Sequence, residues 1–125
     1  MEDKAKIFKK LKPLLEKLKP PLFSKHDDVR YFDLWSQKDI VIDGRKKNEV
    51  SFAAIIIQKN YVGFYFMPIY IEAEMKNIFA PELLKLLKGK SCFYIKKLDE
   101  ALLSQIDDAL KAGFELYRKR GWLSE

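Results

Sequence analysis

Apolar residues recur at helical spacing near the beginning of the chain. The face that they define contains Ile7, Leu11, Leu14, Leu15 and Leu18, with lysines on the opposite face. This pattern predicts an amphipathic helix over about Asp3–Leu18, within a basic N-terminal segment, residues 1–19. Pro13 lies inside the pattern. Because proline removes one backbone donor and crowds the preceding turn, we expect a kink or a break there.

The same spacing returns at the end of the chain and predicts a helix over 99–120. Asp99 is a suitable N-cap, and Leu98 and Leu103 occupy the two positions of a hydrophobic staple. Gly121 follows a basic last turn, and Trp122 is placed to fold back on Tyr117, as at many helix ends.

The middle of the chain alternates apolar and polar residues with a period of two, which is typical of strands. We expect a sheet within residues 30–96, interrupted by a short helix at 81–88 that Pro81 and Gly89 bracket. The predicted strands are Tyr31–Trp35, Ile40–Ile42, Val50–Gln58, Tyr61–Ile71 and Ser91–Lys96. The order of elements predicts one α+β domain over 1–125: a curved antiparallel sheet packed on one face by the N-terminal and C-terminal helices.

The turn Lys59–Asn60 between the two long strands predicts a hairpin register. If Gln58 faces Tyr61, one face is wholly apolar and packs on the helices; it pairs Ala53, Ile55 and Ile57 with Phe66, Phe64 and Val62. The second face is also too apolar to be left freely solvated. We assign to it Phe52, Ile56, Tyr61, Gly63, Tyr65, Met67, Cys92 and Tyr94.

Such a surface is typical of a ligand groove, a homodimer interface or a site for a protein partner. The structural alternative is that the connector Pro20–Asp28 or the strands within Tyr31–Ile42 cover it. The sequence leaves these readings open.

Composition places the chain among soluble single domains. It has 125 residues, of which 48% are hydrophobic and 34% charged. The longest apolar run, Phe52–Ile57, is far shorter than the roughly 20 residues that a membrane span needs. We expect no membrane partner and no secretory signal. The single cysteine excludes an intrachain disulfide, so we expect a cytoplasmic protein.

The formal net charge of +6 is concentrated near the N-terminus, where residues 1–20 contain seven lysines and three acids. A smaller basic cluster contains Lys85, Lys88, Lys90, Lys96 and Lys97. The candidate basic patch comprises Lys4, Lys6, Lys9, Lys10, Lys12, Lys88 and Lys90. Such a patch attracts phosphate backbones or anionic lipid, and it equally suits a solvated helix face.

Candidate chemistry is sparse. The only histidine, His26, and the only cysteine, Cys92, occur in no catalytic motif, and a strand cysteine is usually an apolar filler. Glu72 and Glu74 are candidate cation ligands, which His26 and the acids at 27–28 could approach, but no metal-binding motif contains them. We therefore expect no enzyme, no cofactor and no dedicated metal site.

Nucleic-acid binding is also disfavoured. Tyr61, Tyr65 and Tyr94 could stack bases as strand aromatics do in single-strand binders. However, the RNA-recognition motif is absent, and most lysines belong to one helix.

Two segments resemble a known family. LKGKSCFYIKKLDEALLSQIDDALKAGFELYRKRGW, Leu87–Trp122, is similar to the C-terminal half of the YdhG-like family of small bacterial domains of unknown function. VSFAAIIIQKNYVGFYF, Val50–Phe66, is similar to its central hairpin. The resemblance implies an α+β fold with a curved antiparallel sheet. Some members are described as frataxin-like intracellular iron chaperones, whose iron site is an acidic ridge on the first helix and neighbouring strand. The first helix here is rich in lysine, so no iron-binding residue can be matched.

The sequence therefore predicts a non-enzymatic binding module. We expect the tyrosine-bearing sheet face and the Gly89–Tyr94 edge to bind a small ligand or a protein partner, or to form a homodimer. The alternative is a frataxin-like intracellular iron chaperone.

Overall fold

The computed structural model describes residues 3–124 and contains one antiparallel sheet with helices at both ends. Helix α1 (Lys4–Glu16) precedes β1 (Tyr31–Ile42), β2 (Arg45–Ile57) and β3 (Val62–Phe66). Three short helices follow: α2 (Met67–Ile71), the 3₁₀ helix η1 (Ala73–Ile78) and α3 (Pro81–Leu84). The chain ends with β4 (Leu87–Lys88), β5 (Cys92–Ile95) and α4 (Glu100–Lys119). The α+β class is therefore confirmed.

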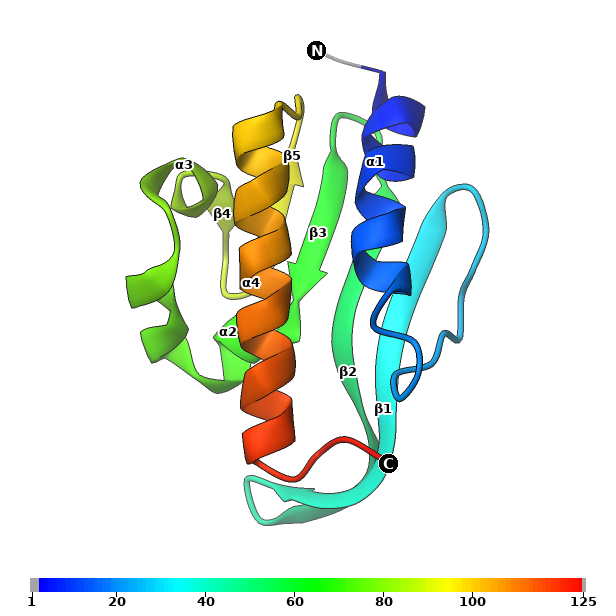
Figure 1. Ribbon diagram of the computed structural model, residues 1–125, viewed down its shortest axis with the longest axis vertical. Coiled ribbons are helices and arrows are strands. Elements are labelled where there is room, and N and C mark those ends of the chain that lie inside the picture. The colour runs from blue at the N-terminus through cyan, green and yellow to red at the C-terminus, as the bar shows by residue number, and fades with distance from the viewer. Residues whose placement is uncertain (1–2, 125) are drawn as a thin grey trace.

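The strands are ordered β1-β2-β3-β5-β4, and every neighbouring pair is antiparallel. Helices α1 and α4 lie side by side on one face of this sheet, with α2 and α3 beside α4 (Figure 1). We call this the helix face, and the opposite side the outer face. None of the described helices is both long enough and apolar enough to cross a membrane.

The core fills the space between the helix face and the helices. Ile7 and Leu11 of α1 and Ile106 and Leu110 of α4 are fully buried and belong to one core cluster with strand residues such as Phe64. Gly113 of α4 packs tightly against the end of β3 and the start of α2. A Cβ atom there would lie 2.6 Å from the Cζ atom of Phe66 and 2.8 Å from the Cγ atom of Pro68. Only glycine allows this approach without displacing core side chains.

The predicted hairpin register is confirmed. Ala53 pairs with Phe66, Ile55 with Phe64 and Ile57 with Val62. The residues of these pairs point to the helix face, as the alternation of a strand requires. The predicted C-terminal helix is also confirmed, and Asp99 accepts a hydrogen bond from the Leu102 amide at 2.8 Å.

The assignment of Phe52 to the second face is wrong. The pairing of β1 with β2 shifts register between Leu34 and Trp35. Leu34 pairs with Ala53, and Trp35 pairs with Ser51. Phe52 therefore has no partner on β1 and is the extra residue of a β-bulge. Because a bulge reverses the alternation, Phe52 points to the helix face. It is fully buried there, with its ring centroid 5.1 Å from that of Tyr117 in α4.

The assignment of Met67 to a strand face is also wrong. The strand predicted to reach Ile71 ends at Phe66, and Met67 begins α2 with Pro68 in its first turn. Proline is favoured in the first turn of a helix and cannot donate to a strand ladder, so the chain leaves the sheet here.

Other boundaries differ from the prediction as well. Helix α1 continues through Pro13, which is exposed, as is the residue one turn earlier, Lys9. Water can therefore replace the lost backbone donor. The helix predicted at 81–88 is a single turn, because residues 87 and 88 form β4. The two strands expected within Tyr31–Ile42 form one strand with an irregularity between Gln37 and Ile40.

Candidate functional site

The outer face of the sheet carries most of the residues predicted for the second face. The pairing joins Ile56 to Gly63 and Gly63 to Tyr94 in one row across three strands. In the next row Tyr65 pairs with Cys92. We call six residues the tyrosine face: Ile56, Tyr61, Gly63, Tyr65, Cys92 and Tyr94. All except the buried Gly63 are half-buried, and among residues 3–124 no helix lies over them.

The tyrosine rings make defined contacts with each other and with the sheet. Tyr61 and Tyr94 stack with their ring centroids 3.8 Å apart and their planes 8° from parallel. The ring of Tyr65 lies over Gly63, where a Cβ atom would be 2.8 Å from its Cε1 atom. The Gln58 side-chain amide donates to the Tyr65 hydroxyl at 3.0 Å. Gly63 thus lets an aromatic ring lie against the backbone, and this ring fills the space above the sheet.

Three groups of this face, the hydroxyls of Tyr61 and Tyr65 and the thiol of Cys92, have raised pKa values, which favours their neutral forms at neutral pH. A hydrogen bond with Tyr94, with smaller effects of burial and neighbouring groups, raises the pKa of Tyr61 to about 12. Burial raises the pKa of Tyr65 and of the Cys92 thiol. A raised thiol pKa lowers the fraction of reactive thiolate. His26 does not offset this, because it lies at the β1 edge, separated from Cys92 on β5 by β2 and β3.

A second cluster on the outer face was not predicted from the sequence. It forms around Asp33 of β1, which is 2% exposed. One carboxylate oxygen accepts the amides of Lys25 and His26 at 2.8 and 3.0 Å. The other contacts the His26 Nδ1 atom at 2.7 Å and the Trp35 Nε1 atom at 3.2 Å. A charged residue at a strand position otherwise flanked by apolar ones was the available signal.

The Asp33 cluster fixes the connector to the edge of the sheet. Burial alone would raise the pKa of Asp33, but the hydrogen bonds from His26, Lys25 and Trp35 lower it overall. The connector adds isolated bridges to β1 at Phe23–Trp35 and Asp27–Phe32. The connector therefore lies along the β1 edge, and β1 itself is part of the sheet.

The Asp33 cluster also extends the aromatic surface. The His26 ring stacks on Tyr31 with centroids 4.1 Å apart, and Tyr31 pairs with Ile56 of the tyrosine face. The Lys25 ammonium lies 3.8 Å from the centroid of the Trp35 ring. Half-buried aromatic side chains therefore lie on β1, β3 and β5, with Ile56 of β2 between them.

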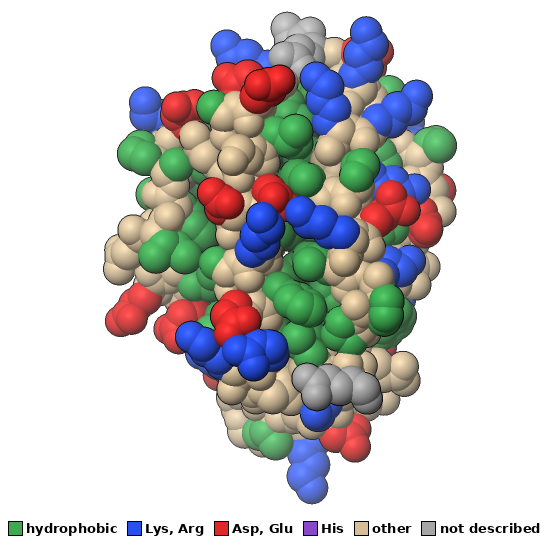
Figure 2. Space-filling model, viewed as in Figure 1, with side chains coloured by type: hydrophobic (Ala, Val, Ile, Leu, Met, Phe, Trp, Pro, Cys, Tyr) green, Lys and Arg blue, Asp and Glu red, His purple; other side chains and the backbone are tan. Residues whose placement is uncertain are grey.

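The predicted basic patch is divided between two places. Lys4 donates to the Gln58 carbonyl at 3.0 Å, and Lys12 pairs with Asp27 at 2.8 Å, while Lys6, Lys9 and Lys10 are exposed on α1. The other two lysines lie at the sheet edge formed by β4: Lys88 is the last residue of β4, and Lys90 follows it in the turn before β5. On the helix side, basic, acidic and hydrophobic side chains are interspersed (Figure 2).

The candidate cation ligands do not converge. Glu72 pairs with Arg120 at 3.0 Å, and Asp27 pairs with Lys12. Between residues 3 and 124 there is no group of three or more His, Cys, Asp or Glu side chains that could hold a metal ion. We assign no metal ligand and no cofactor-binding residue.

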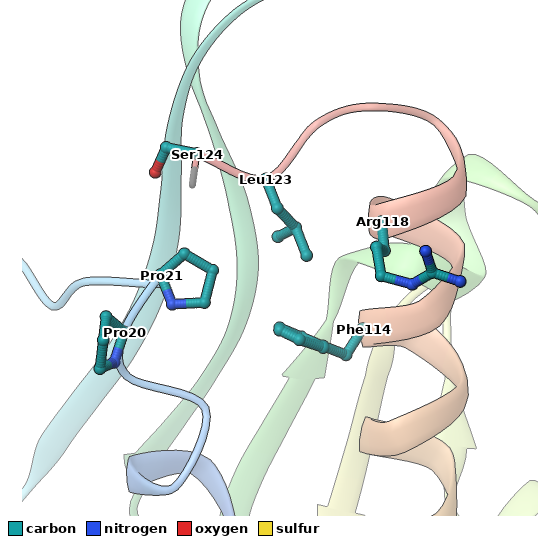
Figure 3. A pocket seen from close by; sticks show the side chains of 6 residues that line it. All are labelled: Pro20, Pro21, Phe114, Arg118, Leu123 and Ser124. Carbon is teal, nitrogen blue, oxygen red and sulfur yellow. The ribbon is translucent and has the colours of Figure 1, made fainter.

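One cavity of about 550 Å³ opens on the helix side (Figure 3). Pro20 and Pro21 of the connector form one wall, and Phe114 of α4 and Leu123 of the C-terminal segment form the other. Arg118 also borders it, but its Nε atom donates to Glu115 at 2.9 Å. The cavity shares no residue with the tyrosine face.

Comparison with models of protein families, with curated proteins and with solved structures finds no match to this chain.

Proposed function

We propose that this protein is a non-enzymatic binding module whose tyrosine face binds a protein partner. The observation that carries the proposal is the stacked, preorganised set of tyrosines on a sheet face that no helix covers among residues 3–124. Tyrosine is enriched at protein interfaces because it supplies a large contact area with little conformational entropy to lose.

The geometry favours a protein over a small ligand. A small molecule is usually enclosed by a concave site, whereas the Tyr65 ring fills the space above Gly63. Tyr61 and Tyr94 cover each other's faces in the same way. A surface whose rings fill its own concave spaces is suited to a complementary protein surface, since a macromolecule can cover several of these rings at once.

The proposal also includes the family and the compartment. The resemblance of Leu87–Trp122 to the YdhG-like family supports a domain of that kind, and the single cysteine supports the cytoplasm. A frataxin-like iron chaperone is the alternative that the resemblance implies, but no observation on the described residues favours it.

Site-specific photo-crosslinking tests the proposal. A photoreactive phenylalanine analogue replaces Tyr61 in one protein and Tyr70 in a matched control, because Tyr70 is a 56% exposed tyrosine on α2, away from the tyrosine face. Both proteins are irradiated in extract of the cells that encode the chain.

We expect one discrete protein to crosslink through position 61 and not through position 70, and to bind again after both components are purified. If position 61, but not position 70, crosslinks to a second copy of the chain, the partner is that second copy and the tyrosine face is a homodimer interface. The same mixture of products from both positions, or none from position 61, would contradict the proposal.

A further inference from the structure

A second candidate site lies beyond the edge of the tyrosine face. A pocket of about 420 Å³ is formed by the segment 82–88, the end of β5 and the first turn of α4. The pairing of β4 with β5 and a hydrogen bond from the Tyr94 amide to the Leu86 carbonyl, 3.0 Å long, hold its walls together. We call it the basic pocket, after the four lysines that line it: Lys85, Lys88, Lys96 and Lys97.

The charges of these lysines are not neutralised by the protein. Within residues 3–124, none of the four ammonium groups makes an ion pair or a hydrogen bond. Other lysines of the chain are paired: Lys12 contacts Asp27 at 2.8 Å, and Lys17 contacts Asp107 at 2.5 Å. The basic pocket is therefore lined by four lysines, none of which is paired with an acid of the described residues.

The two acidic residues of the pocket do not balance the four lysines. Asp99 already accepts the Leu102 amide as the N-cap of α4, and Glu82 is exposed at the first turn of α3. The excess of positive charge raises the local concentration of anions. Several mobile ammonium groups suit a phosphate group, which offers three strong acceptor oxygens.

The lining of the basic pocket also contains apolar side chains. Leu102 is 7% exposed, and Leu86 and Tyr94 are half-buried. An inorganic anion alone would leave this surface in contact with water, whereas an apolar body attached to the anion would cover it. The volume also falls in the range of about 300–1,000 Å³ that is usual for small-molecule sites.

We infer that the basic pocket binds a small phosphate monoester with an aromatic or other apolar body. The lysines bind the phosphate group, and Leu86, Tyr94 and Leu102 contact the body. This inference does not depend on the protein partner proposed for the tyrosine face. The two sites share only Tyr94, so a ligand here can be tested without the partner.

The test uses 1-naphthyl phosphate, 1-naphthol and inorganic phosphate as probes of the 125-residue chain. Amide resonances in ¹H–¹⁵N spectra locate each probe, and titrations give its Kd. The exposed pair Lys85→Ala/Lys96→Ala is compared with Lys6→Ala/Lys10→Ala on α1, which removes the same charge elsewhere. Lys85→Arg/Lys96→Arg restores the charge, and thermal unfolding followed by circular dichroism verifies that each variant is folded.

We expect 1-naphthyl phosphate to shift amides around the basic pocket and to bind more tightly than either 1-naphthol or inorganic phosphate. Removing two charged partners weakens this binding about tenfold or more. The arginine variant restores most of the affinity, and the α1 variant stays within about twofold of the wild type. Three results would overturn the inference: equal weakening by both alanine pairs, naphthol binding as tightly as its phosphate, or shifts confined to the Gly63–Tyr65 region.

Discussion

The buried carboxylate of Asp33 offers a quantitative test of how the outer face is held together. Asp33→Ala removes the acceptor of the Lys25 and His26 amides and of the Trp35 indole. A hydrogen bond to a charged group contributes about 1.5–3 kcal/mol. The His26 ring is half exposed, so water replaces part of its loss. The burial cost of the carboxylate also disappears in the variant, which offsets part of the loss.

We therefore expect Asp33→Ala to lower the free energy of unfolding by about 2–4 kcal/mol. Asp33→Asn keeps one oxygen, which can still accept the amides of Lys25 and His26. Its side-chain NH₂ group replaces the other oxygen and faces the Trp35 indole and the His26 ring as a donor. We therefore expect this variant to lower the free energy of unfolding by about 1–2 kcal/mol. Urea unfolding at pH 7 measures both values. Hydrogen exchange at the Lys25 and His26 amides reports whether the connector has detached from β1.

The same carboxylate gives a pH dependence with a defined sign. The folded-state pKa of Asp33 is below its ordinary value of 3.8. Its contribution is therefore complete above that value and is lost as the pH falls through the lower, folded-state pKa. The difference in unfolding free energy between wild type and Asp33→Asn should shrink as the pH is lowered from about 5 to below 3. A difference under about 0.5 kcal/mol at pH 7, or one that does not shrink in acid, would refute this account of the carboxylate.

Three further predictions concern close contacts and reactivity. Gly113→Ala places a methyl group against the Phe66 ring. Overpacking costs about 1–3 kcal/mol, which exceeds the gain in helix propensity. We therefore expect the midpoint of urea unfolding to be lower than that of the wild type. Gly63→Ala displaces the Tyr65 ring, whose far end can move, so stability changes by less than about 1 kcal/mol while the aromatic ¹H shifts of Tyr65 change. Cys92 reacts slowly with iodoacetamide at pH 8, and the rate is still rising with pH at the ordinary thiol pKa of 9.0, where the rate of an unperturbed cysteine begins to level off. An unchanged Gly113→Ala midpoint, unchanged Tyr65 shifts, or fast alkylation at pH 7 would each contradict the corresponding contact.

The local signals of the sequence predicted much of the fold. The turn at Lys59–Asn60 correctly set the register of β2 against β3, and Asp99 correctly marked the start of α4. Both depend on residues that are close in the sequence, where turn and capping preferences act directly. Six of the eight residues predicted for the second face therefore lie on the outer face. The pairs between β2 and β3 are also those that the predicted register implies.

The errors arose where distant segments determine the geometry. Phe52 points to the helix face because of a bulge against β1, and nothing within β2 itself indicates that bulge. The Asp33 cluster needs the connector and β1 to meet, which depends on tertiary packing. The basic pocket likewise forms only when β4 returns to pair with β5 beside α4.

The central claim is that the tyrosine face binds a protein partner, and the most direct measurement compares two identical substitutions. Tyr65→Lys places a charge on the tyrosine face, and Tyr70→Lys places the same charge on an exposed tyrosine of α2. Calorimetric titration with the crosslinked partner, after circular dichroism has verified both folds, gives the two Kd values. We predict that Tyr65→Lys weakens binding at least about 30-fold, the effect of losing about 2 kcal/mol at a central contact, and that Tyr70→Lys binds within about twofold of the wild type. Equal affinities for the two variants would contradict the claim.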